Sequence, residues 1–321
     1  MLLVDIKNEK IYSLLFKKPL KEREYLMLTS KVIRILERNY KNIGTLPTVI
    51  SSLMTVLDNP RSSTRDIANI IQADQVLSAR LLRLVNSAHY GLRQEVLDIQ
   101  HAVGLVGYNV MRSFTFCITL FDSVFAQSSS SSNFSKEDLW FHSLAVAATT
   151  RHIAKKIGQE NPPDFFVTGL LHDIGKVFTY QFMQHDFFMV VEKAHREEIT
   201  FYNAEKQILT TTHAEIGAWI MTQWKLPSIL VDCVRLHHPE TPINIQGRVL
   251  WHEIIALADC LVKHWQIGSS GDKTIMYQFK DLLTKYRLND NWLRSIYDQV
   301  LQEIEMYSDV IVKKKCHSSR C

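Results

Sequence analysis

Apolar residues recur at the spacing of an α-helix along almost the whole chain. Two examples are segment 26–36, with Leu26, Leu28, Ile33, Ile35 and Leu36, and segment 77–85, with Leu77, Leu81, Leu82 and Val85. Side chains three or four residues apart share one helix face, so this spacing predicts amphipathic helices. Alternating runs typical of β-strands are scarce, and only 11 Gly and 8 Pro occur in 321 residues. The sequence therefore predicts an all-α fold.

Several helix boundaries can be placed from their capping residues. Residues 59–66 place serines shortly before an acid, which predicts a helix that runs through about Gln72. Asp74 is expected to cap a second helix over about 76–86. Gly91 follows that helix and suits a left-handed backbone conformation.

A polar run at residues 127–133, Gln-Ser-Ser-Ser-Ser-Ser-Asn, cannot bury itself. Ser135 and the acids at 137 and 138 predict that the next helix starts at once, so the run is a loop and not a long linker. We therefore expect two helical lobes, residues 1–127 and 136–312.

No apolar run approaches the roughly 20 residues that span a bilayer. The N-terminus meets an acid at Asp5 and has no cleavable apolar core, so no signal peptide is expected. These features predict a cytoplasmic protein without a membrane partner. The cysteines are scattered and show no CxxC spacing, which argues against a disulfide framework or a thiolate zinc site. They are Cys117, Cys233, Cys260, Cys316 and Cys321.

The net charge of +4 is unevenly spread. Residues 1–43 carry ten Lys and Arg against five Asp and Glu, and the tail 313–320 adds four positive charges. These ends leave residues 44–312 with a net charge of about −5. A nucleic-acid-binding protein usually presents a continuous basic face, so this distribution argues against a nucleic-acid partner.

Seven histidine and aspartate side chains fall into five short clusters within about 120 residues. They are His142, His172 with Asp173, His213, His237 with His238, and Asp259. Neutral imidazoles and carboxylates suit divalent transition metals such as Fe, Mn, Co, Ni or Zn. Seven ligands are too many for one ion but suit two ions that share a carboxylate. If the clusters converge, they form a two-metal centre.

The central pair lies in residues 170–176, Leu-Leu-His-Asp-Ile-Gly-Lys. Asp173 can bridge two ions because a carboxylate has two oxygens. His172 and Lys176 are four residues apart and are expected to share a helix face, which would place the ammonium where a phosphate oxygen would lie. Gly175 is expected to leave the approach path free. Asp173 and Lys176 are therefore the candidate catalytic residues.

The remaining clusters also have predicted local structures. Thr211 or Thr212 is expected to cap the helix that starts at His213. His237 and His238 are expected at a helix end, where Pro239 stops the helix and biases His238 towards an extended conformation. Asp259 stands inside an otherwise apolar stretch. Each cluster alone has an ordinary explanation, such as a core histidine, an exposed loop pair or a surface lysine. The ordered set of all five clusters favours the metal centre.

The segment from His142 to Asp259 resembles the HD superfamily of metal-dependent phosphohydrolases, whose central motif matches residues 170–176. The HD-GYP branch of that superfamily uses the same ordered ligand set. The chain as a whole is similar to the HDOD family, the HD-related output domains of bacterial signalling proteins. The similar motifs lie at 46–47, 58–60, 71–74, 81–91 (Leu-Leu-Arg-Leu-Val-Asn-Ser-Ala-His-Tyr-Gly), 102–107, 212–217, 224–227 and 235–238. The resemblance covers residues 46–265.

The HD-GYP resemblance implies how the ligands are shared. One ion would be held by His142, His172, Asp173 and Asp259, and Asp173 would bridge to a second ion held by His213, His237 and His238. The HDOD resemblance implies an N-terminal helical extension (1–45), an N-terminal lobe (46–127), the Ser-rich loop (128–135), an HD-type metal-binding lobe (136–265), and C-terminal helices with a basic tail (266–321).

Two functions remain open. Many HDOD proteins have lost metal ligands and act as signalling modules, which implies a nucleotide ligand or a signalling-protein partner. Here every ligand position is filled, which favours a metal-dependent phosphohydrolase or phosphodiesterase that acts on a phosphoester or nucleotide. The Gly-Tyr-Pro element of HD-GYP proteins is absent after His238, where residues 239–242 read Pro-Glu-Thr-Pro. This difference argues against cyclic-di-GMP as the substrate.

Overall fold

The computed structural model describes residues 30–39, 52, 63–87, 90–92, 94–122, 134–159, 162–240, 243–244, 246–247 and 249–311. This part of the chain consists of α-helices joined by turns and contains no β-strand, which confirms the all-α prediction. The Ser-rich run at 127–133, most of the N-terminal extension and the basic tail lie outside the described residues.

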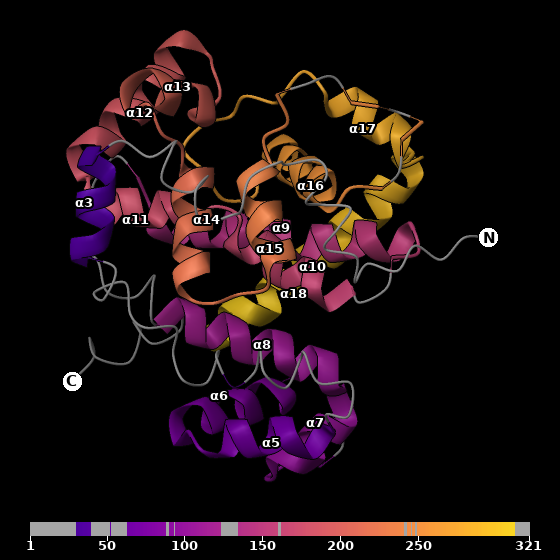
Figure 1. Cartoon of the computed structure of the whole chain (residues 1–321). Coiled ribbons are helices and arrows are strands. Elements are labelled where there is room, and N and C mark those ends of the chain that lie inside the picture. Colours follow the sequence, from indigo (N-terminus) through magenta and orange to yellow (C-terminus); the bar gives the residue numbers. More distant parts are fainter. Residues whose placement is uncertain are drawn as a thin grey trace, which may run out of the picture.

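The helices form two groups with a third between them (Figure 1). The N-terminal group contains α5 (Thr64–Gln72), α6 (Gln75–Val85), α7 (Ile99–Val106) and α8 (Tyr108–Leu120). The middle group contains α9 (Lys136–Lys156), α10 (Pro162–Leu171) and α18 (Asp290–Ile311). The far group contains α11 (Ile174–Phe182), α12 (Gln184–Glu197), α13 (Phe201–Ile208), α14 (His213–Gln223), α15 (Ser228–Leu236), α16 (Trp251–Trp265) and α17 (Phe279–Lys285).

The predicted helix starts agree with the observed caps. Ser63 and Asp66 form a capping box at the start of α5. Asp74 caps α6 and accepts hydrogen bonds from the backbone N–H groups of the next turn. Gly91 has a φ of 53°, as its predicted left-handed conformation requires. Ser135 accepts a hydrogen bond from the backbone N–H of Asp138 and starts α9. These local caps fix the ends of helices that tertiary packing then stabilises.

The C-terminal helix α18 connects the two lobes. It packs against α6 and α8 of the N-terminal group and against α9. Tyr307 of α18 is buried, with its ring 4.0 Å from the ring of Phe114 in α8 and 5.7 Å from that of Phe166 in α10. Glu303 of the same helix accepts hydrogen bonds from Arg151 and pairs with His152 on α9. The two lobes therefore share one continuous apolar core.

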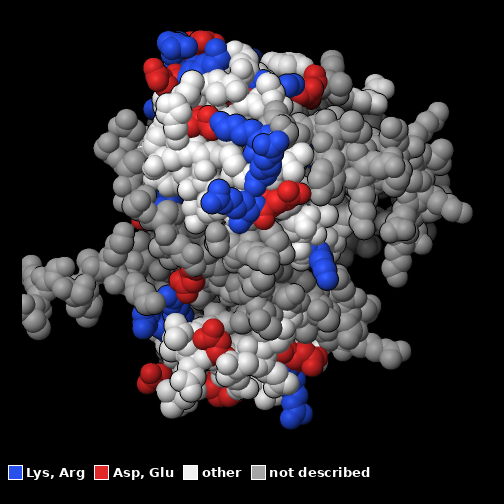
Figure 2. Space-filling view, turned by 60° about the vertical axis from the view of Figure 1, so that its left-hand side comes forward, with Lys and Arg blue, Asp and Glu red and all other residues white. Residues whose placement is uncertain are grey.

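Helix α3 (Ser30–Asn39) belongs by sequence to the predicted first lobe but lies beside α12 in the other (Figure 1). Its apolar side chains Val32 and Leu36 are buried, and Lys31 forms a 2.9 Å ion pair with Asp186 of α12. Helix α3 therefore contacts the other lobe, where its buried face finds the apolar partner that an amphipathic helix needs. Figure 2 brings forward the side of the molecule where α3 and α12 lie, and on this face Lys and Arg side chains lie beside Asp and Glu side chains.

The described helices were compared with the length and hydropathy of a membrane span. None of them alone is long and apolar enough to cross a bilayer. Helices α7 and α8 are long and apolar enough only when taken together, and a bend of 117° separates them.

The predicted character of three cysteines is also clear. Cys117, Cys233 and Cys260 are buried and free, as expected for small apolar core residues. Burial raises the pKa of the Cys260 thiol to about 12, so this side chain stays protonated.

Candidate metal centre

The structure brings the seven predicted ligands together in the second lobe, although they come from distant parts of the chain. His142 lies on α9, His172 and Asp173 form the turn between α10 and α11, His213 is the first residue of α14, His237 and His238 follow α15, and Asp259 lies on α16. Six of these side chains are at most 5% exposed, and His238 is half-buried. The convergence that the metal hypothesis required is therefore present.

One part of the cluster, named here the first half, consists of His142, His172, Asp259 and Oδ2 of Asp173. The Nε2 atom of His142 lies 2.9 Å from Oδ1 of Asp259. The Nε2 atom of His172 lies 3.3 Å from Oδ2 of Asp173 and 3.9 Å from Oδ1 of Asp259. Ligand atoms of His142, His172 and Asp173 all lie within 4.8 Å of one another.

The second half consists of His213, His237, His238 and Oδ1 of Asp173. The Nε2 atom of His213 lies 3.3 Å from that of His237 and 3.0 Å from that of His238. Oδ1 of Asp173 lies 3.2 Å from Nε2 of His213 and 4.0 Å from Nε2 of His237. Asp173 therefore directs one carboxylate oxygen towards each half, which is the arrangement that a bridging ligand requires.

Three histidines are held in a metal-competent orientation by bonds to their other ring nitrogen. Nδ1 of His172 lies 2.7 Å from the carbonyl oxygen of Gly169, and Nδ1 of His237 lies 2.6 Å from that of Val234. A carbonyl oxygen can only accept, so these Nδ1 atoms carry the proton and Nε2 offers a lone pair. Nδ1 of His213 makes the equivalent contact with Glu205, at 2.6 Å from Oε2.

The cluster contains atoms whose bonding potential the protein leaves unused. Nε2 of His172 and Oδ1 of Asp173 are buried and have no hydrogen-bond partner among the described residues. The Nε2 atoms of His213 and His237 lie 3.3 Å apart, and two lone pairs face each other there when both rings carry their proton on Nδ1. For metal–nitrogen bonds of about 2.0–2.1 Å, tetrahedral geometry places two ligand nitrogens about 3.3 Å apart. Divalent cations therefore fit this donor set, and buried acceptors without donors are otherwise costly.

Burial also sets the charge state of the ligands. It lowers the pKa of the imidazoles of His142, His213 and His238, and it lowers the pKa of His237 to about 3. Burial alone would raise the pKa of Asp173, but the charges of His172 and Lys176 outweigh it and hold this pKa well below its usual range. His142, His213, His237 and His238 are therefore neutral imidazoles beside an ionised Asp173, and these are the forms that bind metal.

Lys176 differs from its predicted role in two respects. Helix α10 ends at Leu171 and α11 begins at Ile174, so the prediction that His172 and Lys176 share one helix face is wrong. The helix breaks there because the turn must direct His172 and Asp173 into the cluster. Nζ of Lys176 is buried and donates to Oδ2 of Asp173 at 2.9 Å and to the carbonyl oxygen of Ser270 at 3.0 Å. Its ammonium therefore neutralises the central carboxylate.

Gly175 serves helix packing. A Cβ atom there would lie 2.0 Å from the carbonyl oxygen of His213. The glycine lets α11 approach the first turn of α14 closely, with Gly217 of α14 on the opposite side of the contact. The expected role of Gly175 in clearing an approach path is replaced by this one, since the space beside it is filled by backbone.

The predicted starts and ends of the other ligand helices are confirmed. Thr212 caps α14, and its capping box with Glu215 fixes His213 as the first helical residue. Helix α15 ends at Leu236, before the paired histidines. Asp259 lies in the middle of the buried helix α16.

Several supporting residues were missed by sequence reasoning. Nζ of Lys263 lies 3.2 Å from Oδ2 of Asp259 and 3.3 Å from Oδ2 of Asp272. The four-residue spacing from Asp259 to Lys263 on one predicted helix was a signal that could have found the first pair. Glu205, which contacts His213 from another helix, gave no such signal.

A loop at residues 266–272, which follows α16, covers part of the cluster. Its Ser270 carbonyl accepts from Lys176, and the backbone N–H of Ser269 donates to the carbonyl of Asp138 at 3.0 Å. Gly268 has a φ of 64°, and a Cβ there would lie 2.4 Å from the backbone nitrogen of His142. The loop therefore packs directly on the helix that carries the first ligand.

Comparison with known proteins agrees with this architecture. The model of the HDOD domain matches residues 43–240, which is more than half of the chain, so the protein belongs to the HDOD family. Asp259, Lys263 and the covering loop lie beyond the matched segment.

Three known proteins are similar to this chain in sequence or in fold. An uncharacterised protein of Treponema pallidum is 26% identical over 217 residues, which cover 67% of this chain but only 41% of that protein. An HDOD domain protein from Geobacter sulfurreducens with unknown function has a TM-score of 0.69 and 25% identity, covering 84% of this chain and 93% of that one. A Shewanella amazonensis protein named "Putative phosphohydrolase" has a TM-score of 0.65 and 23% identity, covering 86% and 98%, and shows the same fold.

Proposed function

We propose that this protein is an HDOD-type regulatory module whose second lobe holds two divalent metal ions at the bridged histidine and aspartate cluster. The observation that carries the proposal is the closure of the cluster. Six of the seven ligand side chains are at most 5% exposed, and the ammonium of Lys176 is already bonded to Asp173 and to the Ser270 carbonyl. A closed centre suits a structural or sensory role better than rapid exchange of substrate and product.

The ligands would divide between the ions as the HD-GYP resemblance implies. His142, His172 and Asp259 would hold one ion, the three remaining histidines the other, and Asp173 would bridge them. Bound there, the ions would supply positive charge that ties the ligand segments together, and Lewis acidity for any phosphoester that reached them. A nucleotide or a signalling protein that favours one arrangement of these helices would then be the partner.

A metal-dependent phosphohydrolase is the second candidate, favoured by the half-buried position of His238. The ring of Tyr202 stacks on this histidine at 4.6 Å, and its hydroxyl donates to Oε1 of Glu240 at 2.7 Å. Glu240 and Lys206 are exposed beside it. A phosphoester would meet the centre from this side, and Lys176 would contact it only if the bond to Ser270 opened.

A metal analysis combined with a hydrolysis screen tests both candidates. The full chain would be supplied with Mn²⁺ or Fe²⁺ and tested on phosphodiester, phosphomonoester and cyclic-dinucleotide substrates, beside Asp173→Ala. The regulatory proposal expects stoichiometric metal in the wild type, loss of metal in Asp173→Ala, and no turnover in either.

Other outcomes have distinct meanings. Turnover that disappears in Asp173→Ala would overturn the regulatory proposal in favour of the hydrolase. Turnover that survives Asp173→Ala would belong to a contaminant. Substoichiometric metal that His172→Ala leaves unchanged would overturn the metal centre itself.

A further inference from the structure

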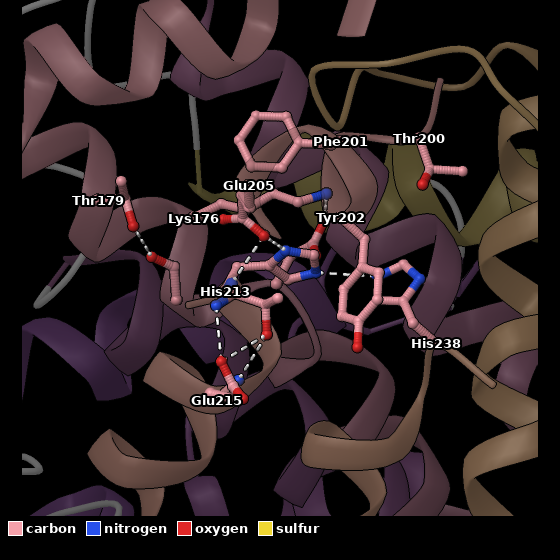
Figure 3. A network of polar contacts seen from close by, with 12 residues as sticks. Lys176, Thr179, Thr200, Phe201, Tyr202, Glu205, His213, Glu215 and His238 are labelled. Atoms are coloured by element: carbon pink, nitrogen blue, oxygen red, sulfur yellow. Dashed lines mark hydrogen bonds and ion pairs between the residues drawn. The ribbon is translucent and has the colours of Figure 1, made fainter. Parts of the chain in front are cut away.

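Glu205 is a fully buried carboxylate next to the second half of the cluster. It lies on α13 and is 0% exposed. Its Oε2 accepts from the backbone N–H of His213 at 2.8 Å and lies 2.6 Å from Nδ1 of the same residue. Figure 3 shows the carboxylate directed at the His213 ring, on the side opposite His238. Both bonds therefore go to one metal-ligand candidate.

The burial of Glu205 beside His213 has a desolvation cost, and packing alone does not explain why the protein retains this side chain. Burial raises the pKa of the Glu205 carboxyl well above its usual range, although the hydrogen bond from the His213 backbone N–H opposes this shift, so desolvation is costly for its ionised form. Within the part of the chain that the structure describes, the second oxygen, Oε1, is buried without a hydrogen-bond partner. Glu205 thus leaves half of its bonding potential unused while it holds His213 at both donors. A group whose purpose was to tie helices together would be expected to share its oxygens between elements.

The helix that carries Glu205 is anchored to residues beside the first half of the cluster. Helix α13 begins at Phe201, whose backbone N–H donates to Oδ2 of Asp272 at 3.0 Å. The same Asp272 oxygen lies 3.3 Å from Nζ of Lys263, which pairs with the ligand Asp259. The start of α13 is therefore anchored to the helix of a first-half ligand, so the carboxylate meets His213 in a preset position.

We propose that Glu205 is a positioning residue for the second half of the centre, an inference that rests on the proposed metal binding. Its carboxylate holds His213 in the Nδ1–H form and directs Nε2 towards His237 and His238. By accepting a hydrogen bond from Nδ1–H it also increases the basicity of Nε2, which strengthens the bond to a cation. The first half has no equivalent contact with Glu205 and does not depend on it in this way.

Glu215 lies on α14, the helix that His213 starts, and offers a matched control. Its Oε2 accepts from Oγ1 of Thr211 at 2.8 Å and from the backbone N–H of Thr212 at 2.8 Å, so it caps α14. No ring nitrogen of His213 is among its partners in the described contacts. Glu215→Gln therefore disturbs the start of α14 without removing the contact to the imidazole.

The test uses the full chain loaded with Zn²⁺ or Co²⁺ and compares wild type with Glu205→Gln, Glu205→Ala and Glu215→Gln. Chelator competition measures the affinity of each ion, and nitrogen NMR of the histidine rings reports the tautomer of His213, assigned with His213→Gln. In Glu205→Ala one ion should bind about 10–100-fold more weakly while the other is unchanged. Glu205→Gln keeps an acceptor oxygen without the charge, so its loss should be smaller. If Glu205→Ala does not fold, the affinities of Glu205→Gln are compared with those of the wild type instead.

The controls decide between positioning and general support. Unchanged affinity of both ions in the Glu205 variants, or an equal loss in Glu215→Gln, would overturn the inference while the metal centre stands. If the wild type binds no metal, the proposed function fails, and the NMR measurement still decides the role of Glu205. A His213 ring that keeps the Nδ1–H form in Glu205→Ala would then overturn it, and a redistributed proton would support it.

Discussion

The two halves of the cluster satisfy their polar groups in different ways. In the first half, Asp259 contacts His142 through Oδ1 and Lys263 through Oδ2, at 2.9 and 3.2 Å. In the second half, three imidazole Nε2 atoms converge with no carboxylate oxygen among them except Oδ1 of Asp173. His238 can donate a proton to His213, but His213 and His237 both carry theirs on Nδ1.

The difference shows where a cation is needed most. Carboxylates and ammoniums balance each other in the first half, where Asp173 and Asp259 face Lys176 and Lys263. Hydrogen bonds and ion pairs can therefore hold that half together without metal. In the second half the Nε2 lone pairs of His213 and His237 face each other, and they repel each other unless a positive charge lies between them. We expect metal to contribute more stability to the second half than to the first.

Removal of one ligand from each half gives the largest effect and tests whether the halves are separable. His237→Gln should lose the second ion and keep the first, and His142→Gln should do the reverse. An ion present at about 1,000 times its dissociation constant stabilises the fold by about 4 kcal/mol. The loss of stability should therefore be greater in His237→Gln. Metal analysis and thermal unfolding with and without chelator measure both quantities, and loss of both ions in either variant would contradict separability.

The residues that sequence could identify are those whose chemistry is local. Ser63, Asp74, Ser135 and Thr212 cap helices through contacts within three residues, so their roles follow from spacing. The ligand types were recognisable because imidazoles and carboxylates in this order are rarely needed together in a core. Helical periodicity was enough for the fold class.

The features that sequence could not identify depend on contacts between distant segments. Lys176 and Ser270 are 94 residues apart, so nothing local indicated that the ammonium is occupied. The same holds for Asp272, which anchors α13 from 71 residues away. The helix break between Leu171 and Ile174 was missed because tertiary contacts outweighed the four-residue periodicity.

The contact between α11 and α14, which holds Asp173 against the second half, gives an intermediate effect. Gly175→Ala would place a Cβ 2.0 Å from the His213 carbonyl and should destabilise the fold by about 3 kcal/mol. A Cβ in Gly217→Ala would meet methyls of Ile174 and Val234 at 3.1 and 3.2 Å and the backbone nitrogen of Gly175 at 3.4 Å. These milder contacts are offset by a gain of about 1 kcal/mol of helix propensity, so the variant should be near neutral. Chemical denaturation compares the two variants. Equal destabilisation would show that the contact is not as close on the Gly175 side as described.

Acidification of the metal-free protein gives the smallest effect per residue and again separates the halves. Burial lowers the pKa of all three second-half histidines, to about 3 for His237, and in the first half that of His142. Because the unfolded chain takes up protons near pH 6.5 while these rings stay neutral in the fold, stability is greatest above about pH 6.5 and falls as the pH is lowered from there towards the folded pKa values.

Each such histidine should cost about 0.8 kcal/mol between about pH 7.5 and pH 6. His238→Gln removes one titrating ring and should reduce the loss by that amount, as denaturation at the two pH values would measure. An unchanged pH dependence in His238→Gln would mean that His238 already binds a proton in the fold. In that case a proton, donated from His238 to His213, would supply the positive charge that the second half otherwise takes from a metal ion.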